Sequence, residues 1–178
     1  MKKIKLYIAV SIDGYIAMPD GNVDWLSDPA QTKKNPGDYG YEEFYDSIDT
    51  TLMGYNTYLE IKGFGIPFPY PDKKNYVFSR HHKKLEKDPV RFIRSDIIPF
   101  VKGLKKEKGK DIWLVGGGQI NGILLQAGLI DEMIITTIPV ILGNGIPLFS
   151  SVSLMKRFAV LEVKNFHDLF VQIRFVKR

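Results

Sequence analysis

The chain contains no cysteine among its 178 residues. This absence excludes a disulfide framework, a zinc site built on thiolates and a cysteine nucleophile. Long apolar runs are missing too, since no stretch approaches the roughly 20 residues that span a bilayer. The apolar segment 6–10 near the N-terminus is too short for a signal peptide, and Asp13 follows it. We therefore expect a soluble cytoplasmic protein.

Histidine is nearly as scarce. Only His81, His82 and His167 are present, and the first two are adjacent in a charged loop. Adjacent side chains diverge, so this pattern indicates neither a metal site nor a Ser-His-Asp arrangement. We predict no metal, and hydrolytic chemistry finds little support.

The composition is that of an ordinary globular domain. Hydrophobic residues make up 44% and charged residues 25% of a 20.3 kDa chain. We find no repeat and no dividing linker, so we predict one domain over residues 1–178. The net charge of +5 favours anionic partners in general. That charge is spread over loops without a basic-aromatic stripe, which argues against nucleic acid as a partner.

Apolar strands alternate with amphipathic helices along most of the chain. Strands are predicted at residues 4–10, 50–53, 75–79, 90–93, 111–115 and 132–138. Helical spacing is found at residues 41–48, 56–61, 97–104 and 120–127. This alternation predicts an α/β fold with a mostly parallel sheet.

The C-terminal stretch predicts a closing antiparallel hairpin of residues 157–164 and 168–177. In its second strand four apolar residues alternate with Gln172 and Arg174. We therefore expect one buried face and one solvated face, with Gln172 and Arg174 on the solvated one. The apolar residues of that strand are Leu169, Val171, Ile173 and Phe175.

The sharpest local feature is the run Gly116-Gly117-Gly118-Gln119 between a buried strand and a helix. Bare backbone there lets a phosphate approach the N–H groups at the start of the helix. The alternative is a tight turn that needs glycine for its dihedral angles. The run is not the dinucleotide fingerprint, because Asn121 stands where the third glycine belongs.

Three weaker candidates accompany it. Gly54 and Thr57 form a second turn from strand to helix, although Thr57 could simply cap that helix. Ser79 and Arg80 end a strand and suit a phosphate, although a solvated basic loop explains them equally well. The acids of the first loops, Asp13, Asp24 and Asp38, are candidate proton donors or turn formers.

Together these residues resemble the dihydrofolate reductase superfamily. The branch they resemble most is the reductase domain of the bifunctional riboflavin-biosynthesis deaminase-reductase. The resemblance covers nearly the whole chain. The segments that carry it are IAVSIDGYIA (8–17), VDWL (23–26), LMGYNTYLEI (52–61), VFSR (77–80), DIWLVGGGQI (111–120) and PVILGNGIPLF (139–149).

The resemblance implies an NADPH-dependent reductase with a central mixed sheet of about eight strands, a usual sheet size. Ala9 and Ile16 would flank the nicotinamide, and Ser79 and Arg80 would face the 2′-phosphate. The diphosphate would contact Gly54, Thr57, Gly117, Gly118, Gln119 and Ile120. The peptide between Gly116 and Gly117 is cis in the family, so we expect it to be cis here.

The sequence also departs from the family pattern. The residue after Gly54 is usually an arginine that binds the 2′-phosphate, but here it is Tyr55, which leaves Arg80 as the available cation. We expect Asp24 to supply the proton or anchor the substrate, with Trp25 and Tyr39 as substrate contacts, although loop packing explains all three as well. Asp24→Asn should then lower turnover.

The resemblance points to 5-amino-6-(5-phosphoribosylamino)uracil as the substrate. The alternatives are dihydrofolate or another pterin, or a nucleotide-binding protein without catalysis. The apolar C-terminal hairpin suggests a homodimer. Three aromatic residues of one loop, Phe64, Phe68 and Tyr70, which we expect to be exposed, suggest the same.

Overall fold

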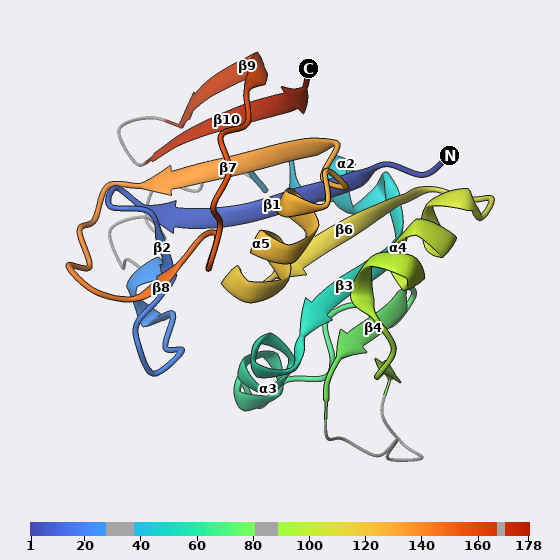
Figure 1. The fold of residues 1–178 in the computed structure, drawn as a ribbon. Coiled ribbons are helices and arrows are strands. Elements are labelled where there is room, and N and C mark those ends of the chain that lie inside the picture. Colours follow the sequence, from blue (N-terminus) through green and yellow to red (C-terminus); the bar gives the residue numbers. More distant parts are fainter. Residues whose placement is uncertain (28–37, 81–88, 167–169) are drawn as a thin grey trace.

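One eight-stranded sheet organises the protein (Figure 1). The computed structural model describes residues 1–27, 38–80, 89–166 and 170–178. The strand order is β5-β4-β3-β6-β1-β7-β10-β9. The bounds are β1 Ile4–Ser11, β3 Ile48–Gly54, β4 Lys74–Phe78, β5 Arg91–Ile93, β6 Asp111–Gly116, β7 Glu132–Ile138, β9 Phe158–Phe166 and β10 Phe170–Lys177.

The strands from β5 to β7 are parallel, and β10 is antiparallel to both β7 and β9. This confirms the predicted α/β class with an antiparallel edge. The central strands are buried on both faces, as parallel strands covered by helices must be. Leu52 and Leu114 are fully buried on one face, and Met53 and Trp113 are buried on the other.

Helices cover both faces of this sheet. The described helices are α2 Tyr41–Asp46, α3 Tyr55–Gly63, α4 Ile97–Lys106 and α5 Gly118–Gln126, with a short 3-10 helix η1 at Asp24–Leu26. In Figure 1, α4 and α5 lie on the near face, where they cover the larger core cluster. Phe44 of α2 packs with Met53 and Trp113 on the opposite face.

One predicted helix is shorter than expected. Ile48 continues the helical spacing of residues 41–48, but it is the first residue of β3 and is fully buried. The helix ends earlier because Ser47 closes it. The Ser47 hydroxyl donates to the carbonyl of Phe44 at 2.7 Å, and its N–H reaches the carbonyl of Glu43 at 3.2 Å.

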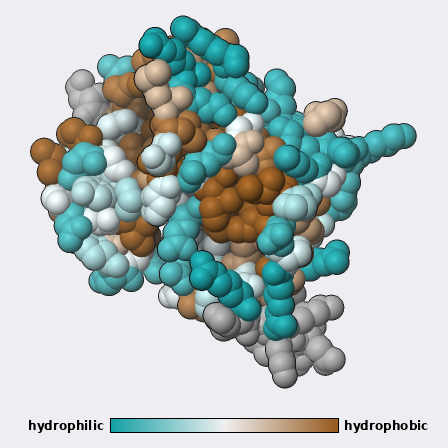
Figure 2. Space-filling view, in the orientation of Figure 1, coloured by the Kyte–Doolittle hydropathy of each residue, from teal (hydrophilic) through white to brown (hydrophobic). Residues whose placement is uncertain are grey.

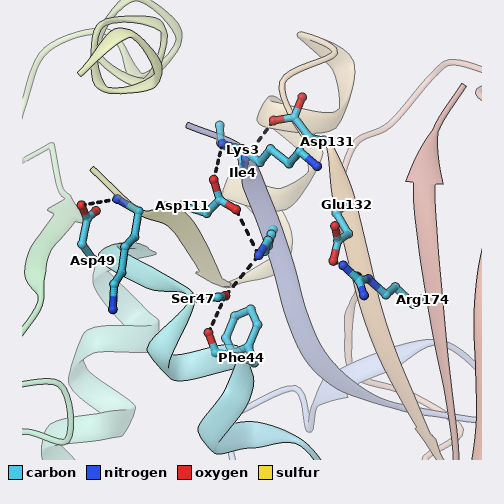
Figure 3. A network of polar contacts seen from close by, with 11 residues as sticks. Lys3, Ile4, Phe44, Ser47, Asp49, Asp111, Asp131, Glu132 and Arg174 are labelled. Carbon is cyan, nitrogen blue, oxygen red and sulfur yellow. Dashed lines mark hydrogen bonds and ion pairs between the residues drawn. The ribbon is translucent and has the colours of Figure 1, made fainter. Parts of the chain in front are cut away.

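Carboxylates join the amino ends of the parallel strands (Figure 3). Asp111 accepts a 2.8 Å hydrogen bond from the N–H of Lys3 and pairs with Lys5 at 3.0 Å. Asp131 accepts a 2.8 Å hydrogen bond from the N–H of Ile4. Because both acids belong to segments beside β1, they fix the position of β1 between β6 and β7.

The predicted faces of β10 are wrong. Phe170 and Gln172 are buried, whereas Val171 is 36% exposed. The buried glutamine is tolerated because its side chain is hydrogen-bonded, with Nε2 donating to the hydroxyl of Thr136 on β7 at 3.1 Å. Arg174 is only partly buried and pairs with the buried Glu132 at 2.7 Å (Figure 3).

Membrane-spanning helices and metal-binding clusters were both expected to be missing, and the structure bears on them only within its described residues. Within them, no helix is both long and apolar enough to cross a bilayer. No group of three acidic or histidine side chains that could hold a metal ion occurs among those same residues. His81, His82 and His167 lie outside the described ranges.

Candidate functional site

A large cleft opens at the carboxyl ends of the parallel strands. Its volume is about 1810 Å³, whereas pockets for drug-sized ligands measure roughly 300–1,000 Å³. Residues that end or follow β1, β3, β4, β5 and β6 line it. Ligands of open parallel sheets bind at this edge, and the volume suits a dinucleotide together with a second molecule.

Two glycine turns meet in the middle of this cleft. Gly54 leads from β3 into α3, and Gly117 leads from β6 into α5. A β-carbon on Gly54 would lie 3.3 Å from a side-chain carbon of Ile120 and 4.0 Å from the nitrogen of Gly117. No side chain among the described residues caps either helix. Two positive helix ends therefore face one space, which suits an anion.

The turn before α5 has the geometry expected from the sequence. The Gly116–Gly117 peptide is cis, which confirms that prediction. A β-carbon on Gly117 would lie 3.1 Å from the hydroxyl of Thr57, so the first turn of α3 touches the second glycine turn. Gly118, Gln119 and Ile120 also line the cleft, as do Gly54 and Thr57, whereas Gly116 is not among the residues that line it.

One end of the cleft carries cations and hydroxyls. Ser79 and Arg80 follow β4, and Arg94 and Ser95 follow β5. The second pair was missed at the sequence level. A signal existed, because each of two neighbouring short strands is followed by an arginine and a serine. Tyr55 also lines the cleft.

The other end of the cleft is apolar. Ala9 of β1 and Ile16 of the strand β2 (Tyr15–Ala17) line it together with Ile146 of the strand β8 (Ile146–Pro147). Apolar residues line the cationic end as well, where α4 begins just after Ser95, including Ile97 and Ile98. Figure 2 shows an apolar patch near the centre of the same view, over the region between α4 and α5.

A strap, residues 139–151, closes the apolar end. It packs so tightly that a β-carbon on Gly118 would lie 2.3 Å from the carbonyl oxygen of Pro147. Asn121 of α5 donates to the carbonyl of Leu148 at 2.9 Å, and its own Oδ1 is buried without a partner among the described residues. The strap also pairs through β8 with β2, so it joins α5 to the loop that carries Ile16.

Asp13, in the turn between β1 and β2, is hydrogen-bonded to the strap. Asp13 accepts hydrogen bonds from the hydroxyl of Ser11 at 2.6 Å and from the N–H groups of Leu142 and Gly143 at 3.2 and 2.8 Å. The hydrogen bond from Ser11, followed by the backbone bonds of the strap, lowers the pKa of Asp13. Asp13 is therefore an anchor for the strap.

The structure brings Trp25 and Tyr39 to one apolar cluster but leaves Asp24 outside it. Asp24 is exposed, accepts a 2.7 Å hydrogen bond from Asn22, and is not among the residues that line the cleft. Trp25, Tyr39 and Ala9 each pack against a small apolar cluster of Ile138 and Phe170. The indole N–H of Trp25 is buried without a partner among the described residues.

Asp38 has a structural role. It accepts hydrogen bonds from the N–H groups of Glu42 at 2.6 Å and Gly40 at 3.1 Å, at the start of α2. These bonds, that of Glu42 first, lower the pKa of Asp38. Asp38 therefore stabilises the beginning of a helix.

Comparison with known proteins points to one family. The family model of the RibD C-terminal domain matches residues 72–171. YwjB of Bacillus subtilis (strain 168), named as an uncharacterized protein, is 40% identical over 176 residues. The match covers 99% of this chain and 98% of YwjB.

Solved structures give the same result. A protein of Shewanella sp. PV-4, named as a candidate riboflavin biosynthesis protein, has a TM-score of 0.85 and 28% identity, with 99% of each chain covered. A diaminohydroxyphosphoribosylaminopyrimidine deaminase/5-amino-6-(5-phosphoribosylamino)uracil reductase of Thermotoga maritima has a TM-score of 0.72 and 19% identity. In that case 99% of this chain but only 57% of the other is covered, so the likeness concerns the fold alone.

Proposed function

The chain belongs to the RibD C-terminal domain family, and on that basis we propose that it is an NADPH-dependent reductase of a small heterocyclic substrate. The observation that carries this proposal is the meeting of two uncapped helix starts, at Gly54 and Gly117, inside one large cleft. A dinucleotide diphosphate is the anion whose size and charge fit such a pair.

The residues of the cleft fit NADPH along its length. The diphosphate would lie against Gly54 and Gly117, where a β-carbon would enter the narrow space between the two turns. Arg80 and Arg94 supply charge for the 2′-phosphate in place of the arginine that Tyr55 replaces. The remaining diphosphate contacts would be Thr57, Gly118, Gln119 and Ile120, with Ser79 beside the 2′-phosphate.

The nicotinamide would lie at the apolar end, between Ala9 and Ile16. When bound, NADPH supplies a hydride at that end. Ala9, Trp25 and Tyr39 pack against the same cluster of Ile138 and Phe170, so the side of Trp25 and Tyr39 is the proposed substrate side. The residues there would hold the substrate's reducible carbon against the nicotinamide and keep water away, which is the protein's main share of the catalysis.

The reduction also needs a residue that supplies a proton to the substrate, and Asp24 is a poor candidate for it. Asp24 is exposed and outside the lining of the cleft, which favours its reading as a loop residue. The acidic residues that do line the cleft are Asp20, Glu60 and Asp96. We therefore expect Asp24→Asn to leave turnover nearly unchanged, contrary to the expectation from the sequence.

As substrate we propose 5-amino-6-(5-phosphoribosylamino)uracil, which the name of the Thermotoga maritima protein specifies for that enzyme. The test is oxidation of NADPH by purified protein in the presence of this compound, with dihydrofolate assayed in parallel. Oxidation with the uracil compound supports the proposal. Oxidation with dihydrofolate alone would make the protein a pterin reductase, and oxidation with neither would favour a nucleotide-binding protein without catalysis.

We also propose that two copies of the chain pair through β9. This strand forms the edge of the sheet, and its Val160, Leu161 and Val163 are 57–60% exposed. An unpaired apolar edge invites pairing with a second strand. Three aromatic residues of one loop were expected to be exposed. Phe64 is exposed, but Phe68 is half-buried and Tyr70 is buried against Trp113.

A further inference from the structure

The edge strand β9 offers a second copy of the chain a long row of backbone groups (Figure 1). It has nine residues, and within the part of the chain that the structure describes it pairs with β10 alone. The strand at the other edge, β5, has only three residues. Two β9 strands that pair with each other close a dimer, whereas β9 of one copy on β5 of the next would continue into a filament. The length of β9 therefore favours its pairing with itself.

Two opposite charges flank Val163 on this strand. The side chains of Glu162 and Lys164 are 44% and 43% exposed, and the Lys164 ammonium lies 3.5 Å from the Glu162 carboxylate. Both point to one face of the sheet, and Val163, which is 60% exposed, points to the other. Charges on an edge strand commonly block pairing. Here, however, the two signs are placed symmetrically about one residue, which suits a partner strand of the same sequence that runs the other way.

The order of these charges selects one register. Level residues on neighbouring strands point to the same face, so two identical antiparallel strands pair about a residue and not about a peptide bond. With Val163 at the centre, Glu162 of each copy is level with Lys164 of the other. With Glu162 at the centre, two glutamates are level, and with Lys164 at the centre, two lysines are. Like charges directly opposite each other are destabilising, so the register about Val163 is favoured over its two neighbours.

The other face of the same segment is aliphatic. Val163 is level with Ile173 of β10. With Val163 at the centre, the two valines are level with each other, and a row of two valines and two isoleucines crosses the junction. Leu161 is the extra residue of a β-bulge, because Val160 and Glu162 are level with adjacent residues of β10. The regular pairing is therefore short, so the two charge pairs at its centre contribute much of its specificity.

We propose that two copies of the chain join through β9 as an antiparallel pair centred on Val163, in which Glu162 of each copy pairs with Lys164 of the other. The two eight-stranded sheets then form one continuous sheet. Because the paired strands run in opposite directions, the two clefts open at opposite edges of that sheet, and both stay open to ligands. The inference rests on the pairing through β9 proposed above and adds its register.

Reversal of either charge tests this register. Glu162→Lys sets lysine against lysine at two places in the dimer, and Lys164→Glu sets glutamate against glutamate. Each should raise the dissociation constant of the dimer about tenfold, because two attractive pairs become repulsive. The variant with both reversals restores the opposite pairs and should dimerise within about twofold of the original chain. With Glu162 at the centre of the pairing, Lys164→Glu would instead leave the dimer unchanged.

A mixture of the two single variants separates the contact between copies from the ion pair within the strand, which both variants lose. Glu162→Lys carries two positive charges on this face of β9, and Lys164→Glu carries two negative ones. Each alone should be largely monomeric at a concentration where the original chain is dimeric. Their equimolar mixture should form mixed dimers, because lysine is again level with glutamate. Lys102→Glu, which reverses an exposed charge on α4, is the matched control and should leave the dimer unchanged.

The measurement is sedimentation equilibrium at low salt, with circular dichroism of each variant as the check on folding. In about 1 M salt, where the screening length is about 3 Å, the differences between variants should shrink. If the original chain dimerises and both single variants dimerise as tightly, the register is overturned and the pairing through β9 stands. A folded double variant that stays monomeric also overturns the register. A monomeric original chain ends the proposed pairing and this inference with it, while the proposed reductase activity is tested separately by NADPH oxidation.

Discussion

Asp13 and Gly143 are hydrogen-bonded to each other although 130 residues separate them in the chain. Oδ2 of Asp13 accepts a 2.8 Å hydrogen bond from the N–H of Gly143, whose φ is +74°. Oδ1 of Asp13 accepts a 2.6 Å hydrogen bond from the Ser11 hydroxyl. The loop that carries Ile16 is therefore tied to the strap, and the strap is tied to α5.

Removal of this anchor should loosen the apolar end of the cleft. We expect Asp13→Ala to weaken NADPH binding about fivefold, the low end of typical coupling between linked segments. A fluorescence titration measures it. Asp46→Ala, which removes an exposed carboxylate from α2, is the control and should change nothing. Equal affinities of the two variants would show that the strap does not support the cofactor site.

Acid should destabilise the fold. Burial alone would raise the pKa of Asp49, but hydrogen bonds from Lys2, Thr50 and the Lys110 N–H hold it below the ordinary value. Asp13 has a lowered pKa as well. A carboxylate with a lowered folded pKa contributes stability that is present above its unfolded pKa and is lost as pH falls through the folded pKa.

We therefore expect the unfolding temperature to be level near neutrality and to fall below about pH 4. Asp49→Asn should flatten that fall, since the variant cannot titrate there. It should also lower stability at pH 7, because the buried ammonium of Lys2 loses its ionic partner. Thermal unfolding followed by circular dichroism across pH tests both. If the unfolding temperature of Asp49→Asn fell with pH in the same way as that of the original chain, Asp49 would not be the cause of the acid sensitivity.

Two glycines in helices should respond oppositely to alanine. A β-carbon on Gly118 would lie 2.3 Å from the Pro147 carbonyl, so Gly118→Ala should cost about 1–3 kcal/mol of unfolding free energy. A β-carbon on Gly103 of α4 meets nothing within 4 Å, so Gly103→Ala should add about 0.5–1 kcal/mol. Urea unfolding measures both. A stabilised Gly118→Ala would mean that the strap does not press on α5.

The proposed pairing through β9 is tested by solution mass. We expect the original chain to sediment as a dimer. Leu161→Lys with Val163→Lys should give a monomer, because charges on an edge strand oppose strand pairing. Phe64→Lys changes the exposed aromatic residue of the other segment that suggested pairing, and it should leave the dimer intact if β9 is the interface. A monomeric original chain would end the proposal.

The parts predictable from the sequence are those whose cause is local. The parallel sheet follows from short apolar strands that alternate with amphipathic helices. The special turn at Gly116–Gly117 can be predicted from the sequence, because an ordinary turn rarely needs three consecutive glycines. The ends of helices follow in the same way. Gly128, for example, has a φ of +67° and follows Ala127, the residue that caps α5, as expected of a glycine that closes a helix.

The parts that failed depend on partners far away in the chain. Gln172 is buried because Thr136, 36 residues earlier, accepts its hydrogen bond. Arg94 enters the cleft because β5 lies beside β4, a neighbourhood that strand alternation does not specify. The sequence left Asp13 as a proton donor or a turn former, and its hydrogen bond to Gly143 of the strap depends on a partner 130 residues away. Local patterns cannot reveal such pairings.

The central claim, a cleft built for NADPH, is tested most directly by fluorescence titration with NADPH and, in parallel, with NADH. We predict that NADPH binds more tightly than NADH, and that Arg80→Ala weakens NADPH binding about tenfold or more while NADH binding is unchanged. This is the effect of losing one hydrogen-bonded charge partner of the 2′-phosphate. Equal binding of both nucleotides would contradict the assignment of Arg80, and binding of neither would contradict the claim itself.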